Sequence, residues 1–374
     1  MKRRPIGIEL FCGVGGMTLG FQQAGFNVAC GVDASERAIR SHAKNFPRAK
    51  SICADVRRLT GPQIMSIAGL PNRSIDVLFG GPPCQGFSIG GAMDPRDERN
   101  DLILQFARLV VGLRPSYFVL ENVVGLLNSR YAPLIAEFER IVRTGGFSLT
   151  KPVRVLDAVA YGVPQRRRRV FFLGNRKGQL PLAYPKPMPR EMRPTVWDAI
   201  GDLYEAHHTC RAHGHNEFSG QLGPASAYAS ILRGETDDPG ICWPRKRRVA
   251  RQLGGFAATE HSEGTIQRFS RVEPGKRDPI SRFIRLRKDG TCTTLRAGTD
   301  VDRGRFMAPR PIHPVDARCI CVREAARLHS FPDWFAFDDT RWHGFMQVGN
   351  SVPPHLARAV AAEVVRAIKT SPSR

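Results

Sequence analysis

One cysteine of this chain occupies a turn that could present it as a nucleophile. Cys84 lies in the sequence Gly-Gly-Pro-Pro-Cys-Gln at residues 80–85, directly after an apolar, β-prone run at residues 75–79. The two prolines restrict φ and remove backbone donors, and open α/β sheets bind their ligands at the carboxyl ends of the strands. Free cysteine is also among the residue types most often buried in protein cores. The turn alone therefore leaves both a reactive and a packing role open for Cys84.

Later in the chain, a glutamate and a group of arginines also lie next to expected strands. Glu121 comes after the apolar run 117–120, and four consecutive arginines occupy residues 166–169. A carboxyl group that is desolvated at a strand end has a raised pKa and can donate a proton near neutral pH. The alternative for Glu121 is a helix-capping or ion-paired carboxylate. Cysteine, glutamate and arginine on neighbouring strand ends together predict nucleophilic and acid–base chemistry.

A glycine-rich turn near the amino terminus indicates a nucleotide-type cofactor. The sequence Phe-Cys-Gly-Val-Gly-Gly at residues 11–16 follows the apolar run 6–10. Such a turn lets a ligand approach the backbone and the start of the next helix. Asp33 and Asp55 end the next two expected strands, where an acid can bind ribose hydroxyls or an adenine amino group. Either aspartate could instead be a helix-cap or turn residue, and the third glycine of a pyrophosphate-binding G-x-G-x-x-G is missing.

Strands and helices alternate over the first half of the chain. Strands are expected at residues 6–10, 28–32, 51–54, 75–79, 117–120 and 170–173, and helices at 17–24, 35–45, 100–113 and 133–143. Ser35 is the expected N-cap of the second helix. This βαβ rhythm predicts a doubly wound, mostly parallel sheet of α/β class.

A proline-rich passage at residues 181–194 ends this rhythm, and the chain up to about residue 314 is irregular and rich in Gly and Arg. We interpret residues 186–315 as a second, smaller domain. A final helix is expected at residues 354–368 and should pack back on the first domain because one of its faces is apolar. The expected division is thus 1–185 plus 316–374, and 186–315.

The composition limits the partners and the compartment. Lys and Arg total 56 against 34 acidic residues, a formal charge of +22, and the excess is spread over the chain. Such a balance favours a polyanion such as nucleic acid, although arginine-rich sequences also become basic without one. No apolar run reaches the length of a membrane span and no signal-peptide pattern occurs, so we expect a cytoplasmic protein without membrane contact.

The five His and Cys residues between 207 and 215 have irregular spacing, and no metal site is expected.

Five motifs in order resemble the DNA (cytosine-5) methyltransferase family, of the bacterial restriction–modification type. They are residues 11–16, the Gly-Pro-Pro-Cys-Gln of residues 81–85, Glu-Asn-Val at 121–123, Gln-Arg-Arg-Arg-Arg at 165–169 and Gly-Asn-Ser-Val at 349–352. The similarity spans nearly the whole chain and fails only over about residues 186–285. It implies a Rossmann-like catalytic domain that binds S-adenosylmethionine, with residues 186–315 as the domain that recognises the DNA target.

The resemblance also implies the catalytic roles. Cys84 would add to carbon 6 of a cytosine flipped out of double-stranded DNA, and Glu121 would hold ring nitrogen N3 and the exocyclic amino group. Arg167 and Arg169, the alternate arginines of the Gln-x-Arg-x-Arg motif, would hold the base's O2 and a nearby phosphate and favour the thiolate. The glycine-containing loop after Cys84 would close over the base, although an ordinary surface loop has the same composition.

The cofactor contacts implied by the resemblance lie at the glycine turn, after the next strands and in the C-terminal motif. They are Phe11, Gly13, Gly15, Gly16, Asp33, Asp55, Val56, Pro83, Leu102, Asn350, Ser351 and Val352.

Three rival interpretations fit this sequence less well. A tRNA cytosine-5 methyltransferase of the same branch would carry a Cys-Phe-Thr signature and a short target region. A silent DNA-binding regulator on this fold would not need the cysteine, glutamate and arginine set, and a dehydrogenase would need the pyrophosphate motif. The expected setting is a monomeric bacterial enzyme at the nucleoid. A cognate restriction endonuclease could act on the same site without being bound.

Overall fold

The computed structural model of the protein describes residues 3–71, 74–83, 101–236, 238, 240–242, 252–298 and 310–370. Cys84 and the expected lid loop after it lie outside these residues. Among the described residues, no helix combines the length and the apolar character needed to cross a membrane.

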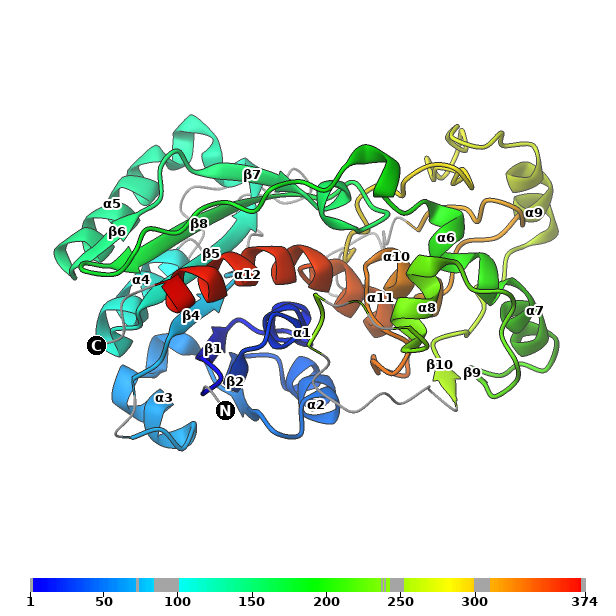
Figure 1. Ribbon diagram of the computed structural model, residues 1–374. Coiled ribbons are helices and arrows are strands. Elements are labelled where there is room, and N and C mark those ends of the chain that lie inside the picture. Colours follow the sequence, from blue (N-terminus) through cyan, green and yellow to red (C-terminus); the bar gives the residue numbers. More distant parts are fainter. Residues whose placement is uncertain are drawn as a thin grey trace.

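A central sheet forms the larger lobe of the molecule (Figure 1). Its strand order is β3-β2-β1-β4-β5-β8-β6, and β7 pairs with β8. The strands are β1 (Ile6–Leu10), β2 (Asn27–Asp33), β3 (Lys50–Cys53), β4 (Val77–Gly80), β5 (Tyr117–Val123), β6 (Phe147–Leu149), β7 (Arg154–Asp157) and β8 (Arg168–Arg176). Strands β1 to β5 pair in parallel, whereas β8 runs antiparallel to β5, β6 and β7. The predicted mostly parallel, doubly wound sheet is confirmed.

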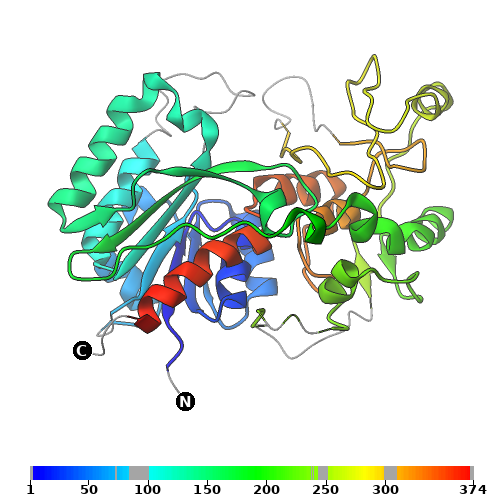
Figure 2. The same ribbon diagram turned by 45° about the horizontal axis from the view of Figure 1, so that its top comes forward.

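Helices cover both faces of this sheet. One face packs on α3 (Gly61–Ile67), α4 (Asp101–Leu113) and α5 (Ala132–Thr144) through residues such as Ile64, Phe106 and Phe138. The other face packs on α1 (Gly16–Gln23) and α12 (Pro354–Thr370) through residues such as Phe21 and Val360. The predicted return of the C-terminal helix to the first domain is therefore confirmed, and Figures 1 and 2 show α12 lying along the sheet.

Most predicted boundaries of the first half agree with the structure to within a few residues. Helix α2 spans Glu36–Asn45, and the hydroxyl of Ser35 accepts a hydrogen bond from the amide of Ala38 at 3.3 Å, as an N-cap does. Helix α3 was not predicted, because its seven residues give too short a periodic pattern.

The second lobe is more regular than its sequence indicates (Figure 2). It contains α6 (Val196–Ile200), α7 (Tyr204–Ala212), α8 (Ala227–Arg233), α9 (Glu263–Ser270) and the short pair β9 (Glu217–Phe218) and β10 (Leu253–Gly254). Helices α10 (Val322–Leu328) and α11 (Arg341–Asn350) share one buried core with α6 and α8. The C-terminal part of the chain thus supports the second lobe before α12 returns to the sheet.

Candidate active site

The ends of five parallel strands bring the candidate residues to one edge of the sheet. Leu10 pairs with Val32 on one side and with Gly80 on the other, and Gly80 pairs with Leu120. The strand order reverses between β1 and β4, which is where doubly wound sheets bind ligands. The glycine turn, Asp33, the Gly81 turn and Glu121 therefore converge at this edge.

The glycine turn after β1 requires its glycines. Gly13 and Gly15 have φ of 53° and 96°, in the left-handed region that favours glycine. A Cβ at Gly16 would lie 2.4 Å from the carbonyl oxygen of Val352, whereas a Cβ at Gly13 would meet no atom within 4 Å. The turn thus packs closely on the C-terminal Ser351–Val352 segment and leaves space above Gly13 for a ligand.

Asp33 lies beside this turn and organises its backbone. One carboxylate oxygen accepts a hydrogen bond from the amide of Gly13 at 2.9 Å, and the other accepts from the amide of Ser35 at 2.8 Å. Burial raises the pKa of Asp33, and the backbone donors oppose that shift. The helix-turn role considered for Asp33 is thus present, and each oxygen keeps a lone pair that a ribose hydroxyl could use.

The other expected cofactor residues lie around the same edge. Asp55 follows β3 and pairs with Arg57 at 2.7 Å, and this partner lowers the pKa of Asp55. Val56 is buried, Leu102 lies in the first turn of α4, and Pro83 is exposed. Phe11 has a positive φ of 57° and packs partly on the core, and Asn350 is exposed at the end of α11. Their contacts with a cofactor remain predictions.

Glu121 and Arg169 form an ion pair at the end of β5. The Arg169 Nε lies 3.0 Å from the Glu121 Oε1, and both side chains are largely buried. Register explains the contact, because Val123 of β5 pairs with Arg169 of β8. Burial raises the pKa of Glu121 above its ordinary value, although the charges of Arg169 and Arg167 oppose this shift. Glu121 is therefore buried, as expected, and it is also ion-paired, which was the alternative considered for it. Its role as a proton donor stays a prediction.

Gly81 brings the Pro-Pro turn against the Glu121 carboxylate. A Cβ at Gly81 would lie 2.7 Å from the Glu121 Oε2, and the Asn122 side-chain amide donates to the Pro82 carbonyl at 3.3 Å. Gly81 and Pro82 are therefore anchored beside Glu121 and Asn122, and Cys84 follows Pro82 by two residues in the sequence. Sequence analysis treated Gly81 only as part of the Gly-Pro-Pro-Cys-Gln motif and missed this close approach.

Replacing Gly81 by alanine should disturb Glu121 more than the fold. The added methyl group meets the end of a flexible side chain, which can move away at little cost in stability. A displacement of about 1 Å at a reacting group can lower a rate about 100-fold. We therefore expect Gly81→Ala to lower kcat by between about 10- and 100-fold with little change in melting temperature. Unchanged kcat would show that Glu121 does not need its present position.

Arg167 is buried and binds the backbone of other segments. Its side chain is 2% exposed. The guanidinium donates to three backbone carbonyls, those of Leu295 at 3.0 Å, Gly349 at 2.8 Å and Ser351 at 2.9 Å. The two terminal nitrogens of Arg167 thus bind other parts of the chain. The role at the base that the resemblance implies for Arg167 stays a prediction.

A buried carboxyl group that sequence reasoning did not single out lies below the glycine turn. The Thr18 hydroxyl donates to Glu9 and lies 3.2 Å from the Nε2 of His42, whose Nδ1 lies 2.7 Å from the Ser51 hydroxyl. Glu9 is 2% exposed, and burial raises its pKa to about 8. The available signal was the acidic residue at the end of an otherwise apolar strand.

Glu9 should make the folded protein less stable as the pH rises. Its folded-state pKa is about 8 against an ordinary value of 4.5, so folding favours the protonated form, and this contribution is lost between those pH values. A shift of this size corresponds to at most about 5 kcal/mol. The free energy of unfolding of Glu9→Gln should therefore gain several kcal/mol relative to wild type between about pH 5 and pH 8, measured by urea unfolding.

Groups that titrate in both proteins cancel in this difference. Parallel pH dependences of the two proteins would contradict a buried, titrating Glu9.

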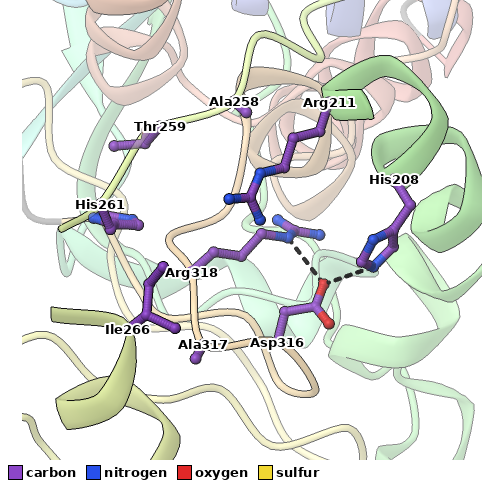
Figure 3. A pocket seen from close by; sticks show the side chains of 9 residues that line it. All are labelled: His208, Arg211, Ala258, Thr259, His261, Ile266, Asp316, Ala317 and Arg318. Atoms are coloured by element: carbon purple, nitrogen blue, oxygen red, sulfur yellow. Dashed lines mark hydrogen bonds and ion pairs between the residues drawn. The ribbon is translucent and has the colours of Figure 1, made fainter. Parts of the chain in front are cut away.

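The second lobe contains a small cavity of about 180 Å³ (Figure 3). His208, Arg211, His261 and Arg318 surround it, and Asp316 binds both Arg318 at 3.0 Å and His208 at 3.2 Å. Of the five His and Cys residues between positions 207 and 215, only His208 lines this cavity. In the described part of the chain, no three His, Cys, Asp or Glu side chains are grouped to hold a metal ion.

Known proteins resemble this chain over nearly its whole length. The family model for the C-5 cytosine-specific DNA methylases matches residues 6–366. The type II methyltransferase M.XorII of Xanthomonas oryzae pv. oryzae is 46% identical over 372 residues, which cover 99% of this chain and 87% of that protein. M1.HphI of Haemophilus parahaemolyticus is 30% identical over 365 residues, covering 96% and 86%.

Solved structures agree with the sequence relatives. A protein described as a DNA modification methyltransferase encoded within an E. coli prophage superposes with a TM-score of 0.79 at 31% identity, covering 98% of this chain and 99% of that one. The S. pombe Dnmt2 methyltransferase shares the fold, with a TM-score of 0.60 at 16% identity and coverage of 98% and 99%. From the family match and the relatives, the chain belongs to the C-5 cytosine-specific DNA methylases.

Proposed function

We propose that this enzyme methylates carbon 5 of cytosine within one short double-stranded DNA sequence, with Cys84, Glu121 and Arg169 acting on the base. Family membership shows the activity, DNA (cytosine-5) methylation that depends on S-adenosylmethionine. The observation that carries the residue assignment is the contact of the Glu121 carboxylate with Gly81, three residues before Cys84, while Arg169 pairs with the same carboxylate.

The chemistry requires a nucleophile because carbon 5 of cytosine is unreactive. Addition of the Cys84 thiolate to carbon 6 forms a carbon–sulfur bond and moves ring electrons toward N3, which leaves an enamine that is nucleophilic at carbon 5. Protonated Glu121 donates to N3 and accepts from the exocyclic amino group. Arg169 would bind O2 and favour the thiolate. After transfer, carbon 5 loses its proton to solvent water, Cys84 leaves as the thiolate, and N3 returns its proton to Glu121, which restores the neutral aromatic ring.

The glycine turn supports the cofactor assignment. The space above Gly13 and the free lone pairs of Asp33 suit a ligand with ribose hydroxyls. S-adenosylmethionine supplies an electrophilic methyl group there. We assign its binding to the glycine turn, to Asp33, Asp55, Val56, Pro83 and Leu102, and to the C-terminal Asn350, Ser351 and Val352.

We assign the reading of the DNA sequence to residues 186–315. The charge of +22 provides attraction to phosphates that does not depend on sequence, and side chains of the second lobe would read base edges in the major groove. Flipping the target base costs about a few kcal/mol. By analogy with the type II methyltransferases it resembles, we place the enzyme in a bacterial restriction–modification system. It would act as a monomer at the nucleoid in the cytoplasm, with no stable complex with an endonuclease.

Bisulfite sequencing tests this function directly. DNA from bacteria that express the enzyme should carry 5-methylcytosine at every copy of one short sequence and nowhere else. Unmodified DNA from cells that contain folded enzyme would contradict the proposal. Modification confined to RNA would favour a tRNA enzyme instead.

A further inference from the structure

A buried group of three polar side chains joins three parts of the chain behind the active site. Gln165 and Arg167 precede β8, and His329 follows α10; all three are at most 2% exposed. We call these three residues the junction. Their partners lie in the second-lobe residue Leu295 and in the C-terminal Gly349 and Ser351.

The hydrogen-bond directions in the junction follow from its donors. The amide of Leu295 donates to the Gln165 Oε1 at 3.0 Å, so the Gln165 Nε2 is the donor, to the Leu328 carbonyl at 3.3 Å and to the His329 Nδ1 at 2.9 Å. The other nitrogen, Nε2 of His329, must then carry the proton and donate to the Ser351 carbonyl at 2.9 Å. Burial and the charge of Arg167 keep the pKa of His329 well below its ordinary range, which agrees with a neutral ring.

Arg167 shares one of these acceptors, the Ser351 carbonyl, and binds two others. Its three hydrogen bonds reach Leu295, Gly349 and Ser351, so the Ser351 carbonyl accepts from both Arg167 and His329. Asn350 lies between two residues whose carbonyls are bound in this way. The following carbonyl, of Val352, packs on Gly16 of the glycine turn.

The junction therefore connects the two halves of the active site. On one side it holds the C-terminal segment that closes the glycine turn. On the other side it continues into β8, where Arg169 pairs with Glu121 two residues after Arg167. The strand-like contact between Gln165 and Cys292 attaches the second lobe at the same place.

We propose that Gln165, Arg167 and His329 are positioning residues that fix the C-terminal segment for S-adenosylmethionine, and that they act without touching the DNA or the base. This inference rests on the proposed cofactor site and goes beyond it. It predicts that loss of a junction hydrogen bond weakens cofactor binding even when no DNA is present, because the carbonyls of Gly349 and Ser351, which flank Asn350, lose donors.

The test is calorimetric titration of the DNA-free enzyme with S-adenosylhomocysteine. Arg167→Lys and His329→Phe should raise its Kd about 10-fold or more. Phenylalanine keeps an aromatic ring beside Phe331, with which His329 stacks at 5.8 Å, and removes both nitrogen partners. In steady-state assays the KM for S-adenosylmethionine should rise by a larger factor than kcat falls.

Matched controls separate positioning from general destabilisation. Arg323 is 3% exposed and also donates to three carbonyls, those of Gly254, Pro332 and Phe335, away from the cofactor segment. His313 is fully buried and binds amides of the second lobe. Arg323→Lys and His313→Phe should lower the melting temperature as their counterparts do, with a Kd for S-adenosylhomocysteine within about twofold of wild type.

The outcomes are distinct. An unchanged Kd in both junction variants, or weaker DNA binding with an intact Kd, would overturn the inference and return Arg167 to the DNA. Should Arg167→Lys fail to fold, His329→Phe and Gln165→Met decide the question. Wild-type enzyme that neither binds S-adenosylhomocysteine nor methylates DNA would instead contradict the proposed function.

Discussion

Cys84→Ala is expected to abolish methyl transfer while leaving DNA binding and cofactor binding close to wild type. Without the thiolate no bond forms at carbon 6, and carbon 5 stays too weakly nucleophilic to attack the methyl donor. The loss should exceed about 10⁴-fold, because covalent activation is the step on which the later ones depend. Radiolabelled methyl incorporation measures the loss, and a mobility-shift assay measures the DNA affinity.

Covalent trapping gives this prediction a second readout. In DNA with 5-fluorocytosine at the target position, carbon 5 carries fluorine in place of the proton that must leave, so the adduct cannot collapse. Wild-type enzyme should form a complex that survives denaturing electrophoresis, and Cys84→Ala should form none. Exposed Cys53 and Cys242 provide controls, since alanine at either position should leave trapping intact. Methyl transfer by Cys84→Ala would rule out the covalent mechanism.

The parallel sheet of the first lobe could be predicted because its strands are apolar and alternate regularly with helices along the chain. Residues 6–10 and 117–120 are continuous apolar or nearly apolar runs, as expected of strands buried on both faces. Since parallel strands end at one edge, the register alone places Glu121 beside the Gly81 turn. Ser35 was predictable for a different reason, because an N-cap is a local signal.

The second lobe could not be predicted in the same way. Helices α6 and α8 have five and seven residues, too few for a periodic apolar face. They are stabilised by a core to which α10 and α11, more than 80 residues later, contribute. A buried ion pair between Arg327 and the distant Asp202, at 3.1 Å, adds to it. Such long-range partners leave no trace in local sequence.

Arg167 shows where prediction of the active site from the sequence ends. The family resemblance implies that Arg167 and Arg169 both hold the base, and the pairing of Arg169 with Glu121 is compatible with that role. The partners of Arg167 are carbonyl oxygens at positions 295, 349 and 351. Every residue type has such a carbonyl, so no side-chain pattern reveals this contact before the chain is folded.

Glu121→Gln is expected to lower kcat by about 10² to 10⁴, the range of a lost general acid. The amide can still donate to N3 of cytosine and accept from the exocyclic amino group, so the flipped base remains bound. It cannot transfer a proton as electron density moves to N3, and the addition of Cys84 therefore loses its driving force. Single-turnover rates at saturating cofactor measure this effect, and the trapped adduct should form correspondingly slowly.

Glu363→Gln provides the matched control. Glu363 is a buried carboxylate that pairs with Arg366 at 2.6 Å, but it lies on α12, away from the strand ends. Its loss should leave the single-turnover rate within about twofold of wild type, as for other substitutions away from the site. Equal losses in the two variants would show that the effect of Glu121→Gln is structural.

The pH dependence separates proton donation by Glu121 from a purely electrostatic role. Burial raises the pKa of Glu121, so the protonated donor persists to a higher pH than for an exposed glutamate. The wild-type rate should fall as the pH rises through this raised pKa, because the donor is lost while the Cys84 thiolate becomes more abundant. Glu121→Gln keeps a neutral amide at every pH, so this fall should disappear and its residual rate should rise with thiolate formation. A decline at high pH that is the same in both proteins would exclude Glu121 as the proton donor.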